Sequence, residues 1–244
     1  MNTLAMCCAV LVLSACATQT LTERASDSKV APGLSAAATL EATYASLRST
    51  GGVVYKLEPS DSSVHMYAFR AGQARQFGHN HVLSAPHFWG YAFVANSSGG
   101  ASRFDLEFRL DELEIDIPEE RSMLGESFAT RLSPEQVGST REHMLGAFGL
   151  QADQFPLVRI RSVQILGEAP KYAAQISLEL HGQQRVMQVP LTVRATPSSL
   201  QVDGALVLLQ SDFGVKPYSV MGGLLAVQDP VVVEFQLHGV ALEP

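Results

Sequence analysis

Cysteine is almost missing from this chain. Its 244 residues include three cysteines, Cys7, Cys8 and Cys16, and none follows residue 16. The rest of the chain therefore has no disulfide framework, no thiolate nucleophile and no cysteine-based zinc site. This distribution excludes several classes of enzyme and of small disulfide-stabilised domain.

Charge is sparse as well, and basic charge in particular. Charged residues make up 17% of the chain, and the formal net charge is −7. Because nucleic-acid binding depends on Lys and Arg side chains that neutralise phosphates, we expect no nucleic-acid partner. Hydrophobic residues reach 46%, which is enough for a core in a single domain of this length.

Motifs of the common enzyme classes are also absent. The sequence contains no G-x-S-x-G, no P-loop and no G-x-G-x-x-G, which are the signals of hydrolases, NTPases and dinucleotide-binding folds. We therefore expect a protein that binds a molecule without transforming it.

The N-terminal residues have the pattern of an export signal. The apolar run Leu4–Leu13 is far shorter than the ~20 residues of a transmembrane helix, and it ends in Leu13-Ser14-Ala15-Cys16. These four residues resemble a bacterial lipobox, whose cysteine becomes the lipidated first residue of the mature protein; a buried hydrophobic helix is the alternative. The resemblance implies a signal peptide at residues 1–15 and lipidation of Cys16. Because Ala17 is not acidic, it also implies an outer-membrane anchor that faces the periplasm.

Residues 16–50 are predicted to form a tether. They are rich in Ala, Ser and Thr, with a break at Pro32-Gly33 and a short helix expected over residues 35–48. The folded domain is then expected at residues 51–244.

Strict alternation of apolar and charged residues predicts strands in this domain. The clearest case is Arg103–Leu110, in which one face is apolar and the other charged. Past Asp111 the apolar residues move from even to odd positions, which predicts a β-bulge or a strand break there. Similar alternation occurs in residues 172–180, 187–193, 200–208 and 231–237. Turns are predicted between these segments at 167–170, 182–184 and 196–199.

One helix interrupts these strands. Ser133, Pro134 and Gln136 place a capping serine, a proline at the first helical position and a glutamine three residues after the cap, so we expect a helix to about Leu145. Many short antiparallel strands with a single helix predict an all-β barrel or sandwich. Because the charged residues must face water, the apolar residues should face inward, opposite to a membrane-spanning barrel.

Several segments resemble the YceI-like family, the lipocalin-like polyisoprenoid-binding proteins. The likeness extends over roughly residues 53–240. It rests on segments that follow one another in the family's order: Tyr55–Ser63, Phe155–Ser162, Ile176–Val186 with Val189–Leu191, and Ser211–Gly214. The first hairpin, Arg70–His81, is more polar and richer in histidine than is typical of the family.

The resemblance implies an all-β fold, an eight-stranded antiparallel lipocalin-like β-barrel with one inserted helix. It also implies an apolar lumen without a catalytic centre, and an isoprenoid chain such as a quinone or polyprenyl lipid as the ligand. A bound lipid of this kind is the one cofactor-like group expected. The candidates for the lining of the lumen are Phe88, Trp89, Tyr91, Phe93, Phe104, Phe108, Ile176, Leu178, Leu180 and Phe235. The alternative is that these side chains fill a closed core and the protein is a scaffold without a ligand.

The polar hairpin has three interpretations. His79 and His81 lie two residues apart, so on a strand they point to the same side and could reach one metal ion or haem. A zinc site needs further ligands, for which His87, His143 or an acidic residue are candidates. Alternatively, Arg70, Arg75, His79 and His81 hold a phosphate or quinone head group at the barrel opening. In the third interpretation the histidines form hydrogen bonds to the backbone of a loop.

Overall fold

The structure of the chain is a computed structural model that describes residues 32–96 and 101–243. The predicted signal peptide at residues 1–15, the predicted lipidation site Cys16 and the first half of the predicted tether lie outside these residues. Among the helices of the described residues, none combines the length and the apolar character that crossing a bilayer requires.

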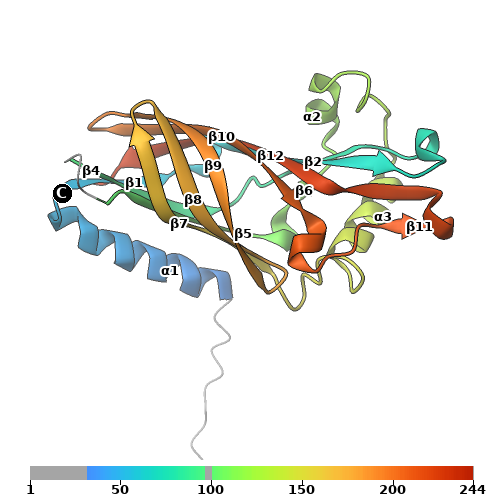
Figure 1. Cartoon of the computed structure of the whole chain (residues 1–244), viewed down its shortest axis with the longest axis horizontal. Helices are drawn as coiled ribbons and strands as arrows, with labels where there is room; N and C mark the ends of the chain where they lie inside the picture. The colour runs from blue at the N-terminus through green and yellow to red at the C-terminus, as the bar shows by residue number, and fades with distance from the viewer. Residues whose placement is uncertain (1–31, 97–100, 244) are drawn as a thin grey trace, which may run out of the picture. The chain divides into compact units, whose positions relative to one another are not determined.

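The described residues form one antiparallel sheet of twelve strands (Figure 1). The strands are β1 (Gly52–Leu57), β2 (Ser63–Ala71), β3 (His81–Ser84), β4 (Trp89–Ala95), β5 (Arg103–Arg109), β6 (Glu114–Ile115), β7 (Leu157–Glu168), β8 (Lys171–Leu180), β9 (Gln183–Ala195), β10 (Ser199–Leu209), β11 (Ser219–Val220) and β12 (Leu225–Ala241). The helices are α1 (Pro32–Ala45), α2 (Pro118–Met123) and α3 (Pro134–Leu145).

Eight of the strands close into a barrel. Their order is β1-β4-β5-β7-β8-β9-β10-β12, and the circle closes where β12 pairs with β1 through the register Tyr55 to Ala241. Closure leaves no free strand edge in this part of the sheet, which protects it from pairing with other chains. The predicted eight-stranded antiparallel barrel is confirmed.

A second group of strands extends the wall at one end of the barrel. The 17-residue strand β12 pairs with β1 near its C-terminal end and with β2 over residues 226–236. Strands β3 and β6 continue the extension beyond β2. Among the described strands β6 pairs with β3 alone, so the wall is open on its far side, where α3 and the segment after it lie (Figure 1).

The alternation in β5 decides which side chains face the barrel axis. Residues that pair directly across antiparallel strands share a face, and Leu106 pairs with Ile160, which pairs with Leu178. This row of apolar side chains faces the interior. The strand ends at Arg109, and a 3₁₀ turn of residues 110–112 leads to β6, so the predicted strand break is confirmed.

Helix α3 begins as the sequence predicts. The Ser133 hydroxyl accepts a hydrogen bond from the Gln136 N–H, and the Gln136 side chain accepts one from the Ser133 N–H, which together form a capping box. The prediction of a single inserted helix is wrong, because the short helix α2, with Pro118 in its first turn, lies between β6 and α3.

Helix α1 shows that the predicted tether ends too late. Leu40 and Tyr44, one helical turn apart, pack against Val54, Tyr91 and Phe93 on the outside of the barrel. Helix α1 and the barrel form one compact unit, so the folded part starts well before residue 51. Leu40 and Tyr44 are the buried side chains by which this Ala-rich helix docks on the sheet.

Candidate functional site

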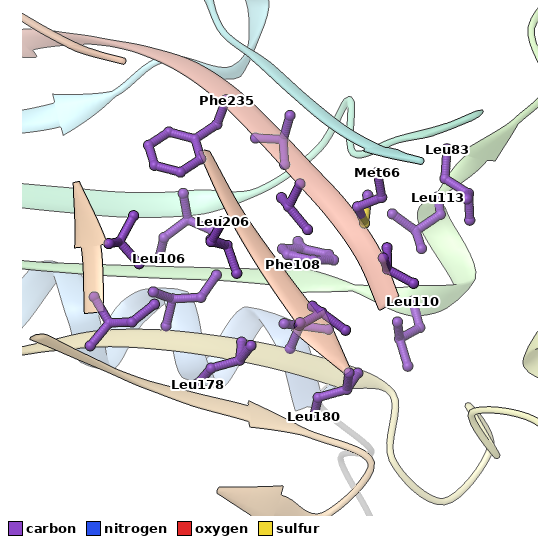
Figure 2. Close-up of a pocket in the computed structure, with 18 of the residues that line it drawn as sticks. Met66, Leu83, Leu106, Phe108, Leu110, Leu113, Leu178, Leu180, Leu206 and Phe235 are labelled. Carbon is purple, nitrogen blue, oxygen red and sulfur yellow. The ribbon is translucent and has the colours of Figure 1, made fainter. Parts of the chain in front are cut away.

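The barrel encloses a cavity of about 1410 Å³. Figure 2 shows apolar side chains from opposite walls that point toward this space, among them Leu106, Phe108, Leu178, Leu206 and Phe235. Pockets for small molecules usually measure ~300–1,000 Å³, so this cavity has room for a larger apolar guest. The interior is therefore hollow along the barrel axis.

Seven of the ten predicted lining residues border the cavity. They are Phe93, Phe104, Phe108, Ile176, Leu178, Leu180 and Phe235. Phe93 contributes to the wall, although its side chain belongs to the cluster beneath α1 on the outside of the barrel.

The prediction is wrong for Phe88, Trp89 and Tyr91, none of which lines the cavity. Trp89 pairs with Glu107 and Tyr91 pairs with Asp105, both on the outer face of β5. The ring of Tyr91 stacks on that of Tyr44 at 5.4 Å between centroids, so α1 covers it. Phe88 precedes β4 and is buried in the main core.

Other lining residues were missed by the sequence analysis. Leu206 and Val233 lie on apolar faces that the alternation of β10 and β12 already indicates. Leu83 comes from the short strand β3, Leu113 lies just before β6, and the segment 146–150 follows α3. Residues 81–84 and 146–150 show no period-two pattern, so only the fold brings them to the cavity.

Polar side chains gather at the end of the cavity that is bordered by α3. We call this end the mouth; its polar lining residues are His81, Ser139, Thr140, Glu142, His143, Gln210, Lys216, Tyr218 and Ser219. The ring of His143 on α3 lies 4.9 Å from that of Tyr218, which links the helix to the segment before β11. Lys216 is exposed at the mouth.

Of the four head-group candidates in the polar hairpin, His81 alone lines the cavity. The Arg70 guanidinium donates to the Gly78 carbonyl at 3.1 Å within the hairpin, and Arg75 is exposed at the hairpin tip. The predicted cluster of Arg70, Arg75, His79 and His81 at the opening is therefore not formed. In the part of the chain that the structure describes, no three His, Cys, Asp or Glu side chains are placed to hold a metal ion.

The hairpin instead takes part in a network that holds the segment 116–130 against the barrel. His81 Nδ1 lies 2.6 Å from the Asp116 carboxylate, which also accepts from the Val82 N–H at 3.1 Å and from the Arg121 guanidinium. Arg121 donates in turn to the Asn80 carbonyl at 2.7 Å. We call Asn80, His81, Asp116 and Arg121 the polar clamp.

Asn80 joins three segments through its side chain. Its amide oxygen accepts from the Arg70 N–H at 3.0 Å, and its amide nitrogen donates to the Ser127 carbonyl at 3.1 Å. On the same side of the hairpin, the ring of Phe128 packs edge-on against Tyr67 and Phe69. The polar residues of the hairpin thus position the segment that contains α2, which the sequence analysis did not predict.

Two pKa values are shifted here, that of Asp116 in the polar clamp and that of His79 beside it. Burial alone would raise the pKa of Asp116, but hydrogen bonds and charge from His81, the Val82 N–H and Arg121 hold it below its ordinary value. Burial, the adjacent His81 and Arg121 lower the pKa of His79. The site therefore favours an ionised Asp116 and a neutral His79.

A closed antiparallel barrel with an apolar lumen and a polar opening is the architecture of the lipocalin-like class of proteins. The YceI-like domain family matches residues 55–239 of the chain. The chain belongs to the YceI-like family. The segments that carry the sequence resemblance lie mainly on the barrel strands β1, β7, β8 and β9, and otherwise on the turns that follow β1, β8 and β10.

Two solved structures are similar to the chain, and the first of them shares its fold. BcnA of Burkholderia cenocepacia has a TM-score of 0.54 and 16% sequence identity, over 75% of this chain and 98% of that chain. The YCEI protein of Campylobacter jejuni has a TM-score of 0.49 and 8% identity, over 66% of this chain and 85% of that chain. No curated protein matches the chain.

Proposed function

We propose that this protein binds an apolar lipid of the isoprenoid type, such as a quinone or a polyprenyl lipid, in the lumen of its barrel. The observation that carries the proposal is the hollow interior of about 1410 Å³, whose walls are built from the inward side chains of the strands. An apolar cavity of this size gains most from a long hydrocarbon chain, because such a chain removes apolar surface from water on both partners.

The energetics favour an isoprenoid chain. Burial contributes roughly 0.8 kcal/mol per CH₂, so one five-carbon unit is worth on the order of 3–4 kcal/mol before entropy losses. Two or three units then suffice for stable binding. The branched apolar lining, which includes Leu106, Leu178 and Leu206, can pack against the methyl branches of such a chain.

The polar end of the lipid is placed at the mouth. Lys216 is available there as a hydrogen-bond donor, and His143 and His81 line the same cavity. A phosphate or quinone oxygen at this end would accept a hydrogen bond from Lys216 while the chain extends along the barrel axis. This arrangement replaces the head-group site predicted around Arg70 and Arg75.

Lipid anchoring at Cys16 and a periplasmic position at the outer membrane complete the proposed function. They rest on the lipobox-like sequence at residues 13–16 and on Ala17. A lipid-anchored carrier of this kind would keep its barrel close to the bilayer from which an isoprenoid comes.

Mass spectrometry tests the binding proposal. The protein is purified without detergent, and an organic extract is analysed beside an elemental analysis of the same sample. We expect an isoprenoid lipid near one equivalent. An extract without lipid, from protein that also fails to take up added quinone or polyprenyl phosphate, would contradict the proposal.

A further inference from the structure

Two loops project together beyond the mouth. One is the tip of the β2–β3 hairpin, Gly72–His79, and the other is the segment Met221–Leu224 between β11 and β12. They are joined where the Ala74 N–H donates to the Leu224 carbonyl at 2.9 Å and where Ala71 pairs with Ala226. We call these two loops the tip; Figure 1 shows them at the same end as α3.

Large apolar side chains are exposed at the tip and at the mouth. Phe77 is 73% exposed and Met221 is 72% exposed, although each lies on a short structured turn. At the mouth, Phe148 is 98% exposed and also borders the cavity. Single exposed apolar residues need no explanation, but several beside the opening of an apolar cavity indicate an interaction surface.

The charge of the tip differs from that of the whole chain. The chain has a formal net charge of −7, yet residues 62–104 and 213–228 contain no Asp or Glu. These stretches supply Arg75 at the tip and Lys216 at the mouth. Glu142, the acidic residue that lines the mouth, belongs to α3 and to neither loop.

We propose that the tip docks onto the surface of a lipid bilayer that contains anionic lipids, with the mouth turned toward the bilayer. Phe77 and Met221 enter the interfacial region, while Arg75 and Lys216 face the lipid phosphates. An apolar chain then passes between bilayer and lumen without crossing water. The direction of this passage rests on the proposed function, whereas the docking itself depends on the tip and on Lys216 beside it.

A depth measurement on the full chain tests the docking. Met221→Cys is labelled with an environment-sensitive thiol fluorophore and mixed with vesicles whose acyl chains carry a quencher. The matched control is Leu166→Cys, which replaces a side chain that is 53% exposed near the other end of the barrel, beside the β7–β8 turn. The unsubstituted chain, labelled in the same way, gives the background from Cys7, Cys8 and Cys16.

We expect the label at 221 to be quenched several-fold more than the label at 166 in vesicles with equal phosphatidylcholine and phosphatidylglycerol. Adding Arg75→Glu and Lys216→Glu should weaken the vesicle-dependent quenching at 221 by at least about tenfold in lipid concentration. Equal quenching of the labels at 221 and 166 would overturn the proposal. It would also be overturned if the label at 221 were quenched as strongly by vesicles of phosphatidylcholine alone as by the mixed vesicles. A third contrary result would be an emission shift of the label at 221 that grows with protein concentration in the absence of vesicles. That shift would show that a second copy of the chain covers the tip.

The two proposals fail separately. The label depth is measured without adding a ligand, and the mass spectrometry of the extract needs no vesicles. A shallow label with an isoprenoid in the extract would reject docking alone. A deep label, with an empty extract from protein that also takes up no added lipid, would reject the proposed ligand alone.

Discussion

Leu206 and Val207 are neighbours on β10 whose side chains lie on opposite faces of the barrel wall. Leu206 borders the cavity, whereas Val207 is 59% exposed on the outside. A bulky residue at 206 enters free volume and shortens the space for a guest, and the same residue at 207 extends into water. The pair therefore separates the effect on the lumen from the effect on the fold.

We expect Leu206→Trp to reduce lipid binding and Val207→Trp to leave it unchanged. Loss of room for one five-carbon unit costs about 3–4 kcal/mol, or more than ~100-fold in affinity. The measurement is the lipid retained per protein and the affinity for an added fluorescent isoprenoid. Thermal unfolding checks that both variants are folded. Equal binding by the two variants would mean that the guest lies elsewhere.

Tyr44 is the residue through which α1 is attached to the barrel. Its hydroxyl donates to the Asp105 carboxylate at 2.7 Å, and Arg103 donates to the same carboxylate at 2.9 Å and lies over the Tyr44 ring. Burial and the nearby Asp105 raise the pKa of Tyr44 far above its ordinary value, so the hydroxyl stays a donor at any physiological pH.

Tyr44→Phe should lower the free energy of unfolding by about 1–2 kcal/mol, because the buried Asp105 carboxylate loses a hydrogen bond but keeps Arg103. The control is Tyr67→Phe, which removes a longer bond to Glu234 at 3.3 Å in a solvent-exposed position and should cost much less. Urea denaturation measures both. Equal losses for the two variants would show that α1 is not held by this contact.

Among the elements, the polar clamp makes the attachment of the α2 segment sensitive to pH. The pKa of Asp116 is lowered in the folded protein, so its stabilising effect is complete above the ordinary Asp pKa and is lost as pH falls through the folded value. The pKa of His79 is also lowered, so below the ordinary His pKa protonation favours the open or unfolded segment. Protonation of Asp116 and protonation of His79 therefore both weaken the attachment of the α2 segment as pH falls.

We therefore expect the segment 116–130 to loosen on acidification before the barrel unfolds. The protection factors of these backbone amides, measured between pH 7 and pH 3 and corrected for the intrinsic exchange rate at each pH, should fall more steeply than those of β8. Asp116→Asn should lower these protection factors at neutral pH and flatten their fall below the ordinary Asp pKa, whereas Asp153→Asn, at an exposed carboxylate, should change neither. A dependence on pH that is unchanged in Asp116→Asn would assign the effect to other groups.

For the molecule as a whole, the proposed anchoring by Cys16 predicts two measurable properties of the exported chain. The N-terminal peptide of the exported wild-type chain should carry the mass of acyl chains, and the protein should sediment with membranes. Cys16→Ser should abolish both, while the purified barrel still binds lipid, because the residues that line the cavity all lie between Leu57 and Leu237. A wild-type N-terminal peptide without acyl mass would reject the anchor.

Much of the barrel could be predicted from local pattern. Strand β5 needs apolar and charged residues in strict alternation, because successive side chains point to opposite faces, and Arg103–Leu110 shows this without an exception. The cap of α3 could be predicted for a similar reason, since Ser133 and Gln136 satisfy each other's backbone N–H groups. The predicted turn at 182–184 was one residue late: it lies at His181-Gly182, both with positive φ, in the manner of a tight hairpin.

The errors in the candidate site have one cause, which is that an apolar residue does not reveal which layer covers it. Tyr91 was expected in the lumen, yet its ring lies on the outer face because α1 supplies a second apolar surface there. Likewise, the polar hairpin suggested a ligand site, but its groups are satisfied by Asp116, Arg121 and Ser127 from segments distant in sequence.

The amino-acid sequence alone determined the strands, the capped helix and the family, because alternation, caps and turn residues act within a few positions along the chain. Only the tertiary structure decided that the barrel is hollow, which end carries the mouth, and that α1 belongs to the folded unit. These properties depend on how much volume the inward side chains leave unfilled and on which distant surfaces meet, and neither quantity is encoded by spacing along the chain.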